Sequence, residues 1–305
     1  MLGLAFLIIS SIIGAGFATG AELVVFFGNS TLPAWVIALL VGVVLLTMFG
    51  IIIFLNEKNF HPPKIFFIPI YFVFFVAMTA GITQIASHFA SILALILSVL
   101  VVLYGFKKMS KFNYAVMIFV LVILLITTLP HIGQAQGQNP NSRPLILNLL
   151  IYAGLNCCLL FPLFKRARKE FTLKQLLASA TTAAITISFF ILIILSSIDK
   201  SGVYPMPILT LSNNFLVVTA ILLCMFTSMF ISLFNIEQST KSNAPTLVLV
   251  SAFAFGLSLL GFTQIVSILY PVLGFAAFFL VVCCFVLQMM PRRIPLSRVL
   301  KLPRP

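Results

Sequence analysis

Long apolar runs that carry almost no charge follow one another along nearly the whole of this 305-residue chain. Hydrophobic residues make up 62% of the sequence and charged residues only 8%. A soluble domain carries about 25% charged residues, so this chain could not cover a globular surface with polar groups. The runs are continuous rather than alternating, which excludes a transmembrane β-barrel. The sequence therefore predicts an all-α polytopic protein that resides in a lipid bilayer.

Ten spans are predicted from these runs at about 20 residues per crossing, with boundaries good to about 2–4 residues. They cover approximately 2–27, 34–55, 65–86, 89–105, 113–129, 145–164, 176–197, 215–234, 245–260 and 263–290. The spans form two blocks of five, at about 1–129 and 145–290. Because five is odd, the second block enters the membrane from the opposite face. Residues 1–290 are therefore expected to form one transmembrane domain, followed by a basic tail at 291–305.

The cations are distributed unequally between the two sides of the predicted membrane. All but two of the 18 Lys and Arg residues fall on the side that both termini share, and the exceptions are Arg143 and Lys200. Loops rich in Lys and Arg stay in the cytoplasm, so both termini are expected to be cytoplasmic in a cell-membrane protein. A nucleic-acid partner is excluded, because its binding face would gather cations and aromatic residues on one domain.

The first predicted span contains a cluster of helix-weakening residues. Gly14, Gly16 and Gly20 each weaken a helix by about 1 kcal/mol relative to alanine. Glu22 is the one carboxylate that lies inside a predicted span. Placing a charge in the middle of a bilayer costs about 3 kcal/mol or more. Thr19 and Glu22 have the spacing of a capping box, in which a hydroxyl and a carboxylate close the free amides of a starting helix. The pattern predicts that the helix stops near Gly14 and restarts at Thr19.

Two other interpretations of this segment stay open. The Gly16-x-x-x-Gly20 spacing is also typical of two helices in close contact in a membrane. Glu22 is either a helix cap alone or, in addition, a site for a proton or a cation. An irregular backbone at this depth is tolerated only where it lines a cavity or is buried in protein.

The sixth predicted span carries a polar stripe. Asn148, Tyr152 and Asn156 recur every four residues and so share one helix face, with Gly154 between them and Pro162 beyond. We predict a second interruption here, because paired interruptions in corresponding spans of two halves indicate a transporter's binding site. The alternative is a seam of hydrogen bonds between intact helices.

The eighth predicted span offers hydroxyl ligands. Cys224, Ser228 and Ser232 share a face and Thr227 flanks them. Oxygen ligands suit a small cation when carbonyls of an unwound segment complete the shell. The alternative is that these hydroxyls bond carbonyls of their own helix.

At these residues the chain resembles the amino-acid/polyamine/organocation (APC) superfamily, and within it the uncharacterised YkvI-like membrane proteins of bacteria. Ile13–Glu22 resembles that group's Gly-Ala-Gly-Phe-Ala-Ser-Gly-Gln-Glu signature, with Thr19 in place of Ser and Ala21 in place of Gln. Tyr152–Asn156 resembles its Tyr-x-x-x-Asn segment, and Ile268–Gly274 its span-10 Tyr-Pro segment.

The resemblance implies the five-plus-five inverted-repeat fold of the leucine transporter, with helices 1 and 6 interrupted. Gly14, Ala15 and Gly16 would then hold a substrate carboxylate and Tyr152 would cover it. Three further residues would belong to the same substrate site, namely Phe17, Gly154 and Asn156. A sodium ion would lie between the carbonyls of Ser10 and Ile13 and the hydroxyls of Thr227 and Ser228. Proton-coupled relatives use a lysine of span 5, which this chain lacks, so sodium is favoured over a proton and no other metal or cofactor is expected.

The sequence thus predicts an ion-coupled secondary transporter of an amino acid or similar amine-carboxylate. The alternative is a receptor or sensor that binds a small ligand on a transporter scaffold without moving it. An intramembrane enzyme is not expected, because the three histidines lie in predicted loops and Glu22 has no carboxylate or histidine partner within a span. A channel is disfavoured because no ring of charged residues marks a filter.

Overall fold

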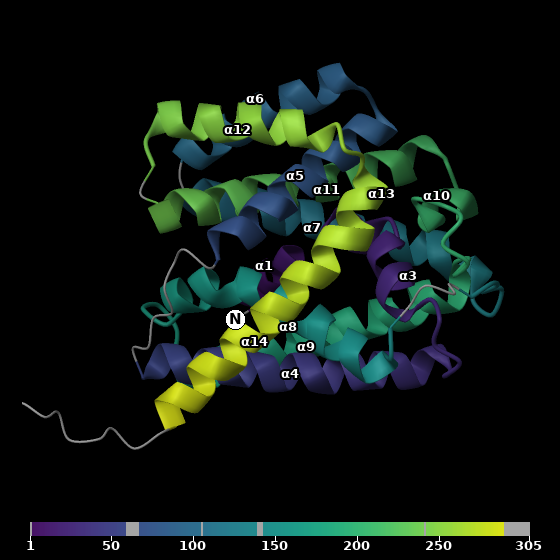
Figure 1. The fold of residues 1–305 in the computed structure, drawn as a ribbon, viewed down its shortest axis with the longest axis horizontal. Helices are drawn as coiled ribbons and strands as arrows, with labels where there is room; N and C mark the ends of the chain where they lie inside the picture. Colours follow the sequence, from purple (N-terminus) through teal and green to yellow (C-terminus); the bar gives the residue numbers. More distant parts are fainter. Residues whose placement is uncertain (1, 59–66, 105, 139–142, 241, 290–305) are drawn as a thin grey trace, which may run out of the picture.

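A computed structural model describes residues 2–58, 67–104, 106–138, 143–240 and 242–289, and these are α-helical with no β-strand. The predicted basic tail at 291–305 lies outside the described residues. The helices shown in Figure 1 have the following bounds: α1 Leu2–Ile12, α2 Ala15–Ala18, α3 Ala21–Phe27, α4 Ala34–Glu57, α5 Ile68–Ile85, α6 His88–Tyr104, α7 Phe106–Thr128, α8 Leu145–Ala167, α9 Leu173–Ser197, α10 Pro207–Leu211, α11 Phe215–Thr240, α12 Ala244–Ser258, α13 Phe262–Gln264 and α14 Tyr270–Met289.

Seven helices in the described part of the chain are long and apolar enough to cross a bilayer. They are Ala34–Glu57, Ile68–Ile85, Phe112–His131, Leu145–Ala167, Leu173–Ser197, Phe215–Thr240 and Phe262–Met289. Three shorter apolar helices, α1, α6 and α12, fall in the other predicted spans. By helix length and hydropathy this is a multi-pass membrane protein, and the all-α prediction is confirmed for the described residues.

Proline and capping residues mark where several helices begin. Pro33 and Pro144 are the N-cap residues of α4 and α8. Proline has no N–H, but a residue at the start of a helix does not need to donate a helical hydrogen bond. A full capping box opens α9: the Thr172 hydroxyl accepts from the Gln175 amide at 3.4 Å, and the Gln175 side chain accepts from the Thr172 amide at 2.9 Å. The helix starts are therefore fixed locally, in or beside polar loops.

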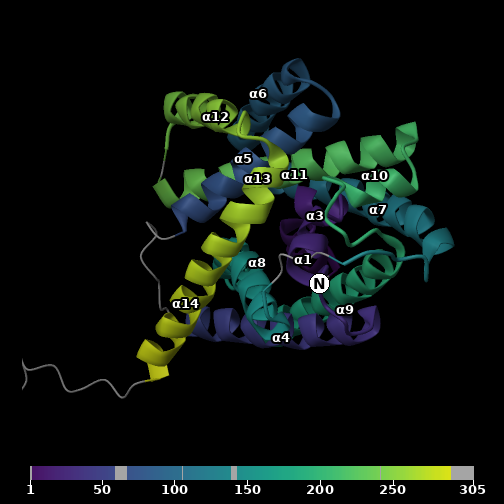
Figure 2. The ribbon, with the colours of Figure 1, turned by 45° about the vertical axis from the view of Figure 1, so that its right-hand side comes forward.

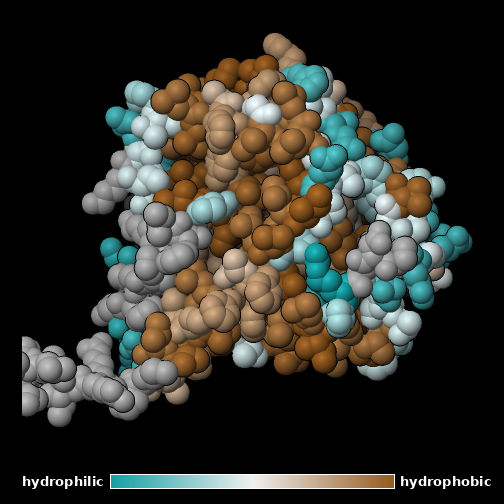
Figure 3. All heavy atoms as spheres, viewed as in Figure 1, coloured by the Kyte–Doolittle hydropathy of each residue, from teal (hydrophilic) through white to brown (hydrophobic). Residues whose placement is uncertain are grey.

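The outer surface of the helices is strongly apolar. Large side chains point outward along α6, α12 and α14, including Phe89, Ile96, Phe253 and Phe279, which are 55–76% exposed. Figure 3 shows hydrophobic residues across most of one broad face, with hydrophilic residues gathered toward its two ends. An apolar surface of this extent is suited to lipid.

The interrupted segment α1–α3 lies in the middle of the helical assembly, as Figure 2 shows. α1 packs against α7, α8, α9 and α11, and α2 packs against α5 and α11. Around this centre α4 pairs with α9, α5 with α11, and α6 with α12. α14 crosses in front of the others in Figure 1 and packs mainly on α8.

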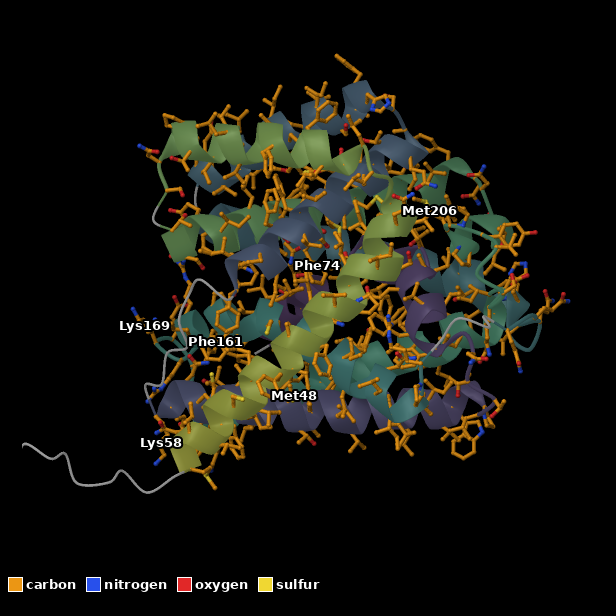
Figure 4. The ribbon with its side chains drawn as sticks, in the orientation of Figure 1. Met48, Lys58, Phe74, Phe161, Lys169 and Met206 are labelled. Atoms are coloured by element: carbon orange, nitrogen blue, oxygen red, sulfur yellow. The ribbon has the colours of Figure 1, made fainter. Side chains whose placement is uncertain are left out.

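The two ends of the molecule differ in charge. Lys58 and Lys169 lie at the same end in Figure 4, and Met206 lies toward the opposite end. The Arg168 guanidinium donates a hydrogen bond to the Asn56 carbonyl in the last turn of α4, which joins the C-terminal ends of α8 and α4 at the basic end. Arg143 lines a cleft together with residues 201–205 at the other end, where the Lys200 amide also bonds the Gln136 carbonyl.

The predicted interruption of the sixth span is wrong, because α8 is one continuous helix from Leu145 to Ala167 with Pro162 inside it. Pro162 has no N–H for the Cys158 carbonyl, and the Tyr71 hydroxyl of α5 donates to that carbonyl at 3.3 Å instead. The neighbouring Leu159 carbonyl accepts from the Asn235 side chain of α11 at 3.4 Å. Donors from two packed helices therefore satisfy the backbone beside the proline, and the helix need not open.

A wider helical turn precedes the Tyr270-Pro271 pair. Residues Ile265–Leu269 form a π-helical turn between α13 and α14. Pro271 cannot donate to the preceding turn and its ring crowds the backbone there, and a π-turn accommodates both effects without ending the helix. The Tyr270 side chain is thereby placed inside the protein, fully buried against Phe74 of α5.

Candidate functional site

The first span is interrupted as predicted. α1 ends at Ile12, and the Gly14 amide donates to the Ile12 carbonyl rather than to Ser10 four residues back. One turn of helix, α2, follows, and α3 begins only at Ala21 after Gly20 in the left-handed conformation, with φ of 79°. The Ile208 amide of α10 donates to the Thr19 carbonyl at 3.0 Å, so another element closes part of the opened backbone.

Two of the predicted glycines are needed because other side chains occupy the space beside them. A Cβ on Gly14 would lie 3.3 Å from both Met78 Cε and Ser228 Oγ, which places this residue between α5 and α11. A Cβ on Gly16 would lie 2.8 Å from Glu22 Oε2 and 2.9 Å from Glu22 Cβ. The Glu22 side chain therefore folds back over Gly16, against the interruption itself. Phe17, on α2, is fully buried.

The predicted capping box of Thr19 and Glu22 is wrong. The N-cap of α3 is Gly20 rather than Thr19, so Thr19 and Glu22 do not occupy the N-cap and N3 positions of a capping box. The Thr19 hydroxyl accepts from the Ala21 amide at 3.4 Å and donates to the Gly16 carbonyl at 3.3 Å. The left-handed turn at Gly20, a conformation that favours glycine, moves the N-cap from Thr19 to Gly20, and α3 starts at Ala21. Glu22 is directed instead toward α8.

The polar stripe of α8 faces the restarted half-helix α3. Asn148 Nδ2 donates to the Phe26 carbonyl at 2.7 Å, in the last turn of α3. The Tyr152 ring packs edge-on against Phe26 and Phe27, with ring centroids 5.6 and 5.3 Å away. Asn156 Nδ2 donates to Glu22 Oε1 at 3.3 Å and to the Tyr152 carbonyl at 2.9 Å. The interpretation of the stripe as an interhelical seam is therefore confirmed.

Gly154 lies on a different face of α8 from this seam. A Cβ there would be 2.5–2.6 Å from the Cβ, Cα and N atoms of Phe278 on α14. On the other helix, a Cβ on Gly274 would be 2.6 Å from the Ile151 carbonyl oxygen. The two glycines let α8 and α14 approach closely, so Gly154 serves helix packing here.

The residues predicted for the ion site are partly brought together. The Ile13 carbonyl accepts a hydrogen bond from the Cys224 thiol at 2.9 Å. The Thr227 hydroxyl donates to the Cys224 carbonyl of its own helix at 2.9 Å, as the alternative interpretation expected. The Ser228 hydroxyl is buried, lies next to Gly14, and has no hydrogen-bond partner among the described residues.

Two residues at this place were not predicted from the sequence. Asn113 of α7 is buried, its Nδ2 donates to Ser10 Oγ at 2.6 Å, and its Oδ1 has no partner in the described structure. The sequence pattern predicts that Cys224 shares a helix face with Ser228 and Ser232, but it predicts no hydrogen bond or ligand role for the thiol. A buried amide in an otherwise apolar span is a signal that would have drawn attention to Asn113.

Unpaired polar atoms concentrate around the interrupted segment. Buried side-chain atoms without a hydrogen-bond partner in the described structure include Asn113 Oδ1, Tyr152 Oη, Asn156 Oδ1, Ser228 Oγ and Tyr270 Oη. Such atoms are rare inside native proteins, because each costs about 1–3 kcal/mol. Their concentration here marks the interruption as the candidate binding region.

The cavities open toward the Arg143 end. One cleft of about 480 Å³ is lined by Phe26, Asn29, Thr31, Arg143 and Asn148. A second, of about 340 Å³, is lined by Ala21 and Val24 of α3, by Arg143 and by Val266 and Ser267 of the π-turn. At the basic end a cavity of about 30 Å³ lies beside Arg166 and Asn235. The half-helix α3 therefore lines clefts at the Arg143 end.

Comparison with known proteins assigns no relative: the chain matches no protein-family model, and a search of curated proteins finds no significant match.

Proposed function

We propose that this protein is an ion-coupled secondary transporter of an amino acid or a similar small amine-carboxylate, working by alternating access. The observation that carries the proposal is the interrupted first span. Its opened backbone lies at the centre of an apolar helical assembly, between α5, α8 and α11. Irregular backbone at membrane depth is tolerated where it serves a site or is buried in protein.

We further propose ten spans arranged as a five-plus-five inverted repeat, with only the first helix interrupted. Helix packing supports this arrangement. In the proposed repeat, α1–α3 together correspond to α8, and α4, α5, α6 and α7 correspond to α9, α11, α12 and α14. The contact of α4 with α8 then corresponds to the contact of α9 with α1. The contact of α6 with α11 likewise corresponds to that of α12 with α5. In a two-fold repeat, each contact between a helix of the first half and a helix of the second half must recur with the two halves exchanged.

Sodium is the proposed coupling ion. Support comes from the Ser228 hydroxyl beside Gly14 and the amide oxygen of Asn113, whose Nδ2 bonds Ser10; both oxygens are buried and have no hydrogen-bond partner among the described residues. Hard oxygen atoms of this kind suit a small cation, and rotation of the Cys224 thiol would free the Ile13 carbonyl as a further ligand.

The proposed setting is the cell membrane, with both termini in the cytoplasm. The end that holds Lys58, Arg168 and Lys169 would then face inward, and Arg143 would face outward. The clefts that reach α3 from the Arg143 end would make the described conformation outward-facing. Transport requires a second conformation in which access shifts to the basic end.

Uptake by proteoliposomes containing the full chain tests the proposal. Radiolabelled amino acids are offered as a panel under a sodium gradient, a proton gradient or neither. We expect uptake of at least one of them under the sodium gradient, and we expect the Thr227→Ala, Ser228→Ala double variant to weaken the sodium dependence while remaining folded. Absence of flux under both gradients would reject transport. Thermal stabilisation by one of the same amino acids without flux would favour the receptor alternative.

A further inference from the structure

A buried carboxylate and three aromatic or amide side chains form a cluster beside the interruption. Glu22 of α3, Tyr152 and Asn156 of α8, and Tyr270 of α14 are each no more than 1% exposed. Asn156 is hydrogen-bonded to Glu22, Tyr152 lies one turn before Asn156 on the same face of α8, and the π-turn that leads into Tyr270 packs against α3. Three helices distant in the chain therefore converge on one carboxylate.

The charge of Glu22 is not balanced by any described cationic side chain. Among the described residues its one side-chain hydrogen bond is the 3.3 Å contact from Asn156 Nδ2, an atom shared with the Tyr152 carbonyl. A carboxylate offers about four lone-pair sites, so most of its capacity is unused. A buried carboxylate persists when it is paired, and the described part of the chain supplies no partner.

The remaining polar atoms of the cluster are available as hydrogen-bond acceptors. The Asn156 amide oxygen and the hydroxyl oxygens of Tyr152 and Tyr270 are buried and have no partner in the described structure. Together with a Glu22 oxygen they provide four acceptors. Aromatic rings surround the cluster, since Tyr152 packs on Phe26 and Phe27 while Tyr270 packs on Phe74.

We propose, resting on the transport function above, that this cluster binds the ammonium group of the transported molecule, with Glu22 as its counter-ion. An alkylammonium has three N–H donors and one positive charge. The cluster offers a carboxylate, an amide oxygen and two phenol oxygens, and the neighbouring rings add cation–π attraction. Because Glu22 lies against Gly16, the bound ammonium would lie beside the opened backbone.

The test is ligand-dependent thermal unfolding of the full chain in detergent. The probes are isoamylammonium chloride, the uncharged isoamyl alcohol, and potassium chloride at equal ionic strength as the salt control. We expect the ammonium salt alone to raise the melting temperature of the wild type beyond the salt control, because a ligand that binds only the folded state stabilises it. We expect the isosteric Glu22→Gln variant to bind at least about tenfold more weakly, since a charge-assisted hydrogen bond is lost.

Variants of the phenols test the same site without removing its charge. Tyr270→Phe keeps the ring contact with Phe74 and deletes one acceptor, and we expect it to weaken binding severalfold. Tyr114→Phe on α7, which likewise keeps its ring contact, here with Phe6, is the matched control and should leave binding unchanged. If Glu22→Gln does not fold, the effect of Tyr270→Phe on ammonium binding tests the site instead.

Three outcomes would overturn the proposal: equal stabilisation by the alcohol, stabilisation retained in Glu22→Gln, or no response of the wild type to the ammonium salt. Failure of this site and failure of transport are separable. Ammonium binding that depends on Glu22, without flux in proteoliposomes, would reject transport and leave the site. Sodium-driven flux that is unaffected by Glu22→Gln would reject the site and leave transport.

Discussion

Asn156 Nδ2 donates a hydrogen bond to Glu22 Oε1 at 3.3 Å, across 134 positions of the chain. This contact joins the carboxylate of the restarted half-helix α3 to the polar stripe of the uninterrupted helix α8. It fixes α3 to α8 at one end, while Asn148 fixes the other end through the Phe26 carbonyl. The half-helix is thus held along its length by one face of one partner.

Gly16→Ala should destabilise the interruption. The new Cβ would meet Glu22 Oε2 at 2.8 Å and Glu22 Cβ at 2.9 Å, so the Glu22 side chain would have to leave its position over α2. Overpacking of this kind costs about 1–3 kcal/mol, and we expect a lower melting temperature in detergent and a loss of any ligand response. Gly50→Ala is the control: α4 has open space at Gly50, and alanine there should raise stability by about 0.5–1 kcal/mol. Equal behaviour of the two variants would contradict the assignment.

Tyr71→Phe should destabilise the protein by about 1–3 kcal/mol, because the Cys158 carbonyl opposite Pro162 would lose the donor that replaces the missing N–H. In a Pro162→Ala background the helix regains its own donor, so the same substitution should cost less. A double-mutant cycle on melting temperatures measures the coupling. Strictly additive effects would show that Tyr71 does not compensate for the proline.

Ser228→Ala should reduce the apparent affinity for sodium by about tenfold, or about 1.4 kcal/mol, if the unpaired hydroxyl beside Gly14 is an ion ligand. Thr227→Val is the matched comparison, because the Thr227 hydroxyl already bonds the Cys224 carbonyl and is expected to matter less. The measurement is the sodium concentration that half-saturates uptake or thermal stabilisation. A larger effect at Thr227 than at Ser228 would place the ion elsewhere.

Gly154→Ala should be more damaging than an alanine elsewhere in the assembly, because the new Cβ would lie within 2.6 Å of the Phe278 backbone, which has no flexible end to move aside. We expect α8 and α14 to separate at a cost of about 3 kcal/mol, seen as a large drop in melting temperature or in the folded yield. Gly256→Ala on α12, where the glycine faces open space, should be tolerated. Retained stability in Gly154→Ala would mean that the two helices are not held this closely.

The interruption of the first span could be predicted because its causes are local. Three glycines within seven residues weaken the helix wherever that segment folds, and a buried carboxylate requires compensation in any fold. The detail of the restart was not predictable. Thr19 and Glu22 have the spacing of a capping box, yet the backbone turn at Gly20 and the Asn156 partner on α8 direct Glu22 away from that role.

The sixth span shows the opposite case. Gly154 and Pro162 have low helix propensity, and propensity alone favours an interruption. The helix stays intact because Phe278 of α14 packs on the glycine, and Tyr71 of α5 supplies the hydrogen bond that the proline lacks. Both partners come from helices that the local pattern does not identify.

The sequence by itself determined that this is an all-α membrane protein, where its apolar helices lie, and that its first span is weakened at Gly14–Gly20. These properties depend on composition, hydrophobic run length and backbone propensity, which are carried by neighbouring residues. Only the tertiary structure decided that the stripe of α8 is a seam with α3, that Asn113 and Cys224 bond Ser10 and Ile13 beside the interruption, and that the π-turn before Tyr270 packs against α3. Those contacts join residues remote in the chain, and their formation depends on how the helices pack.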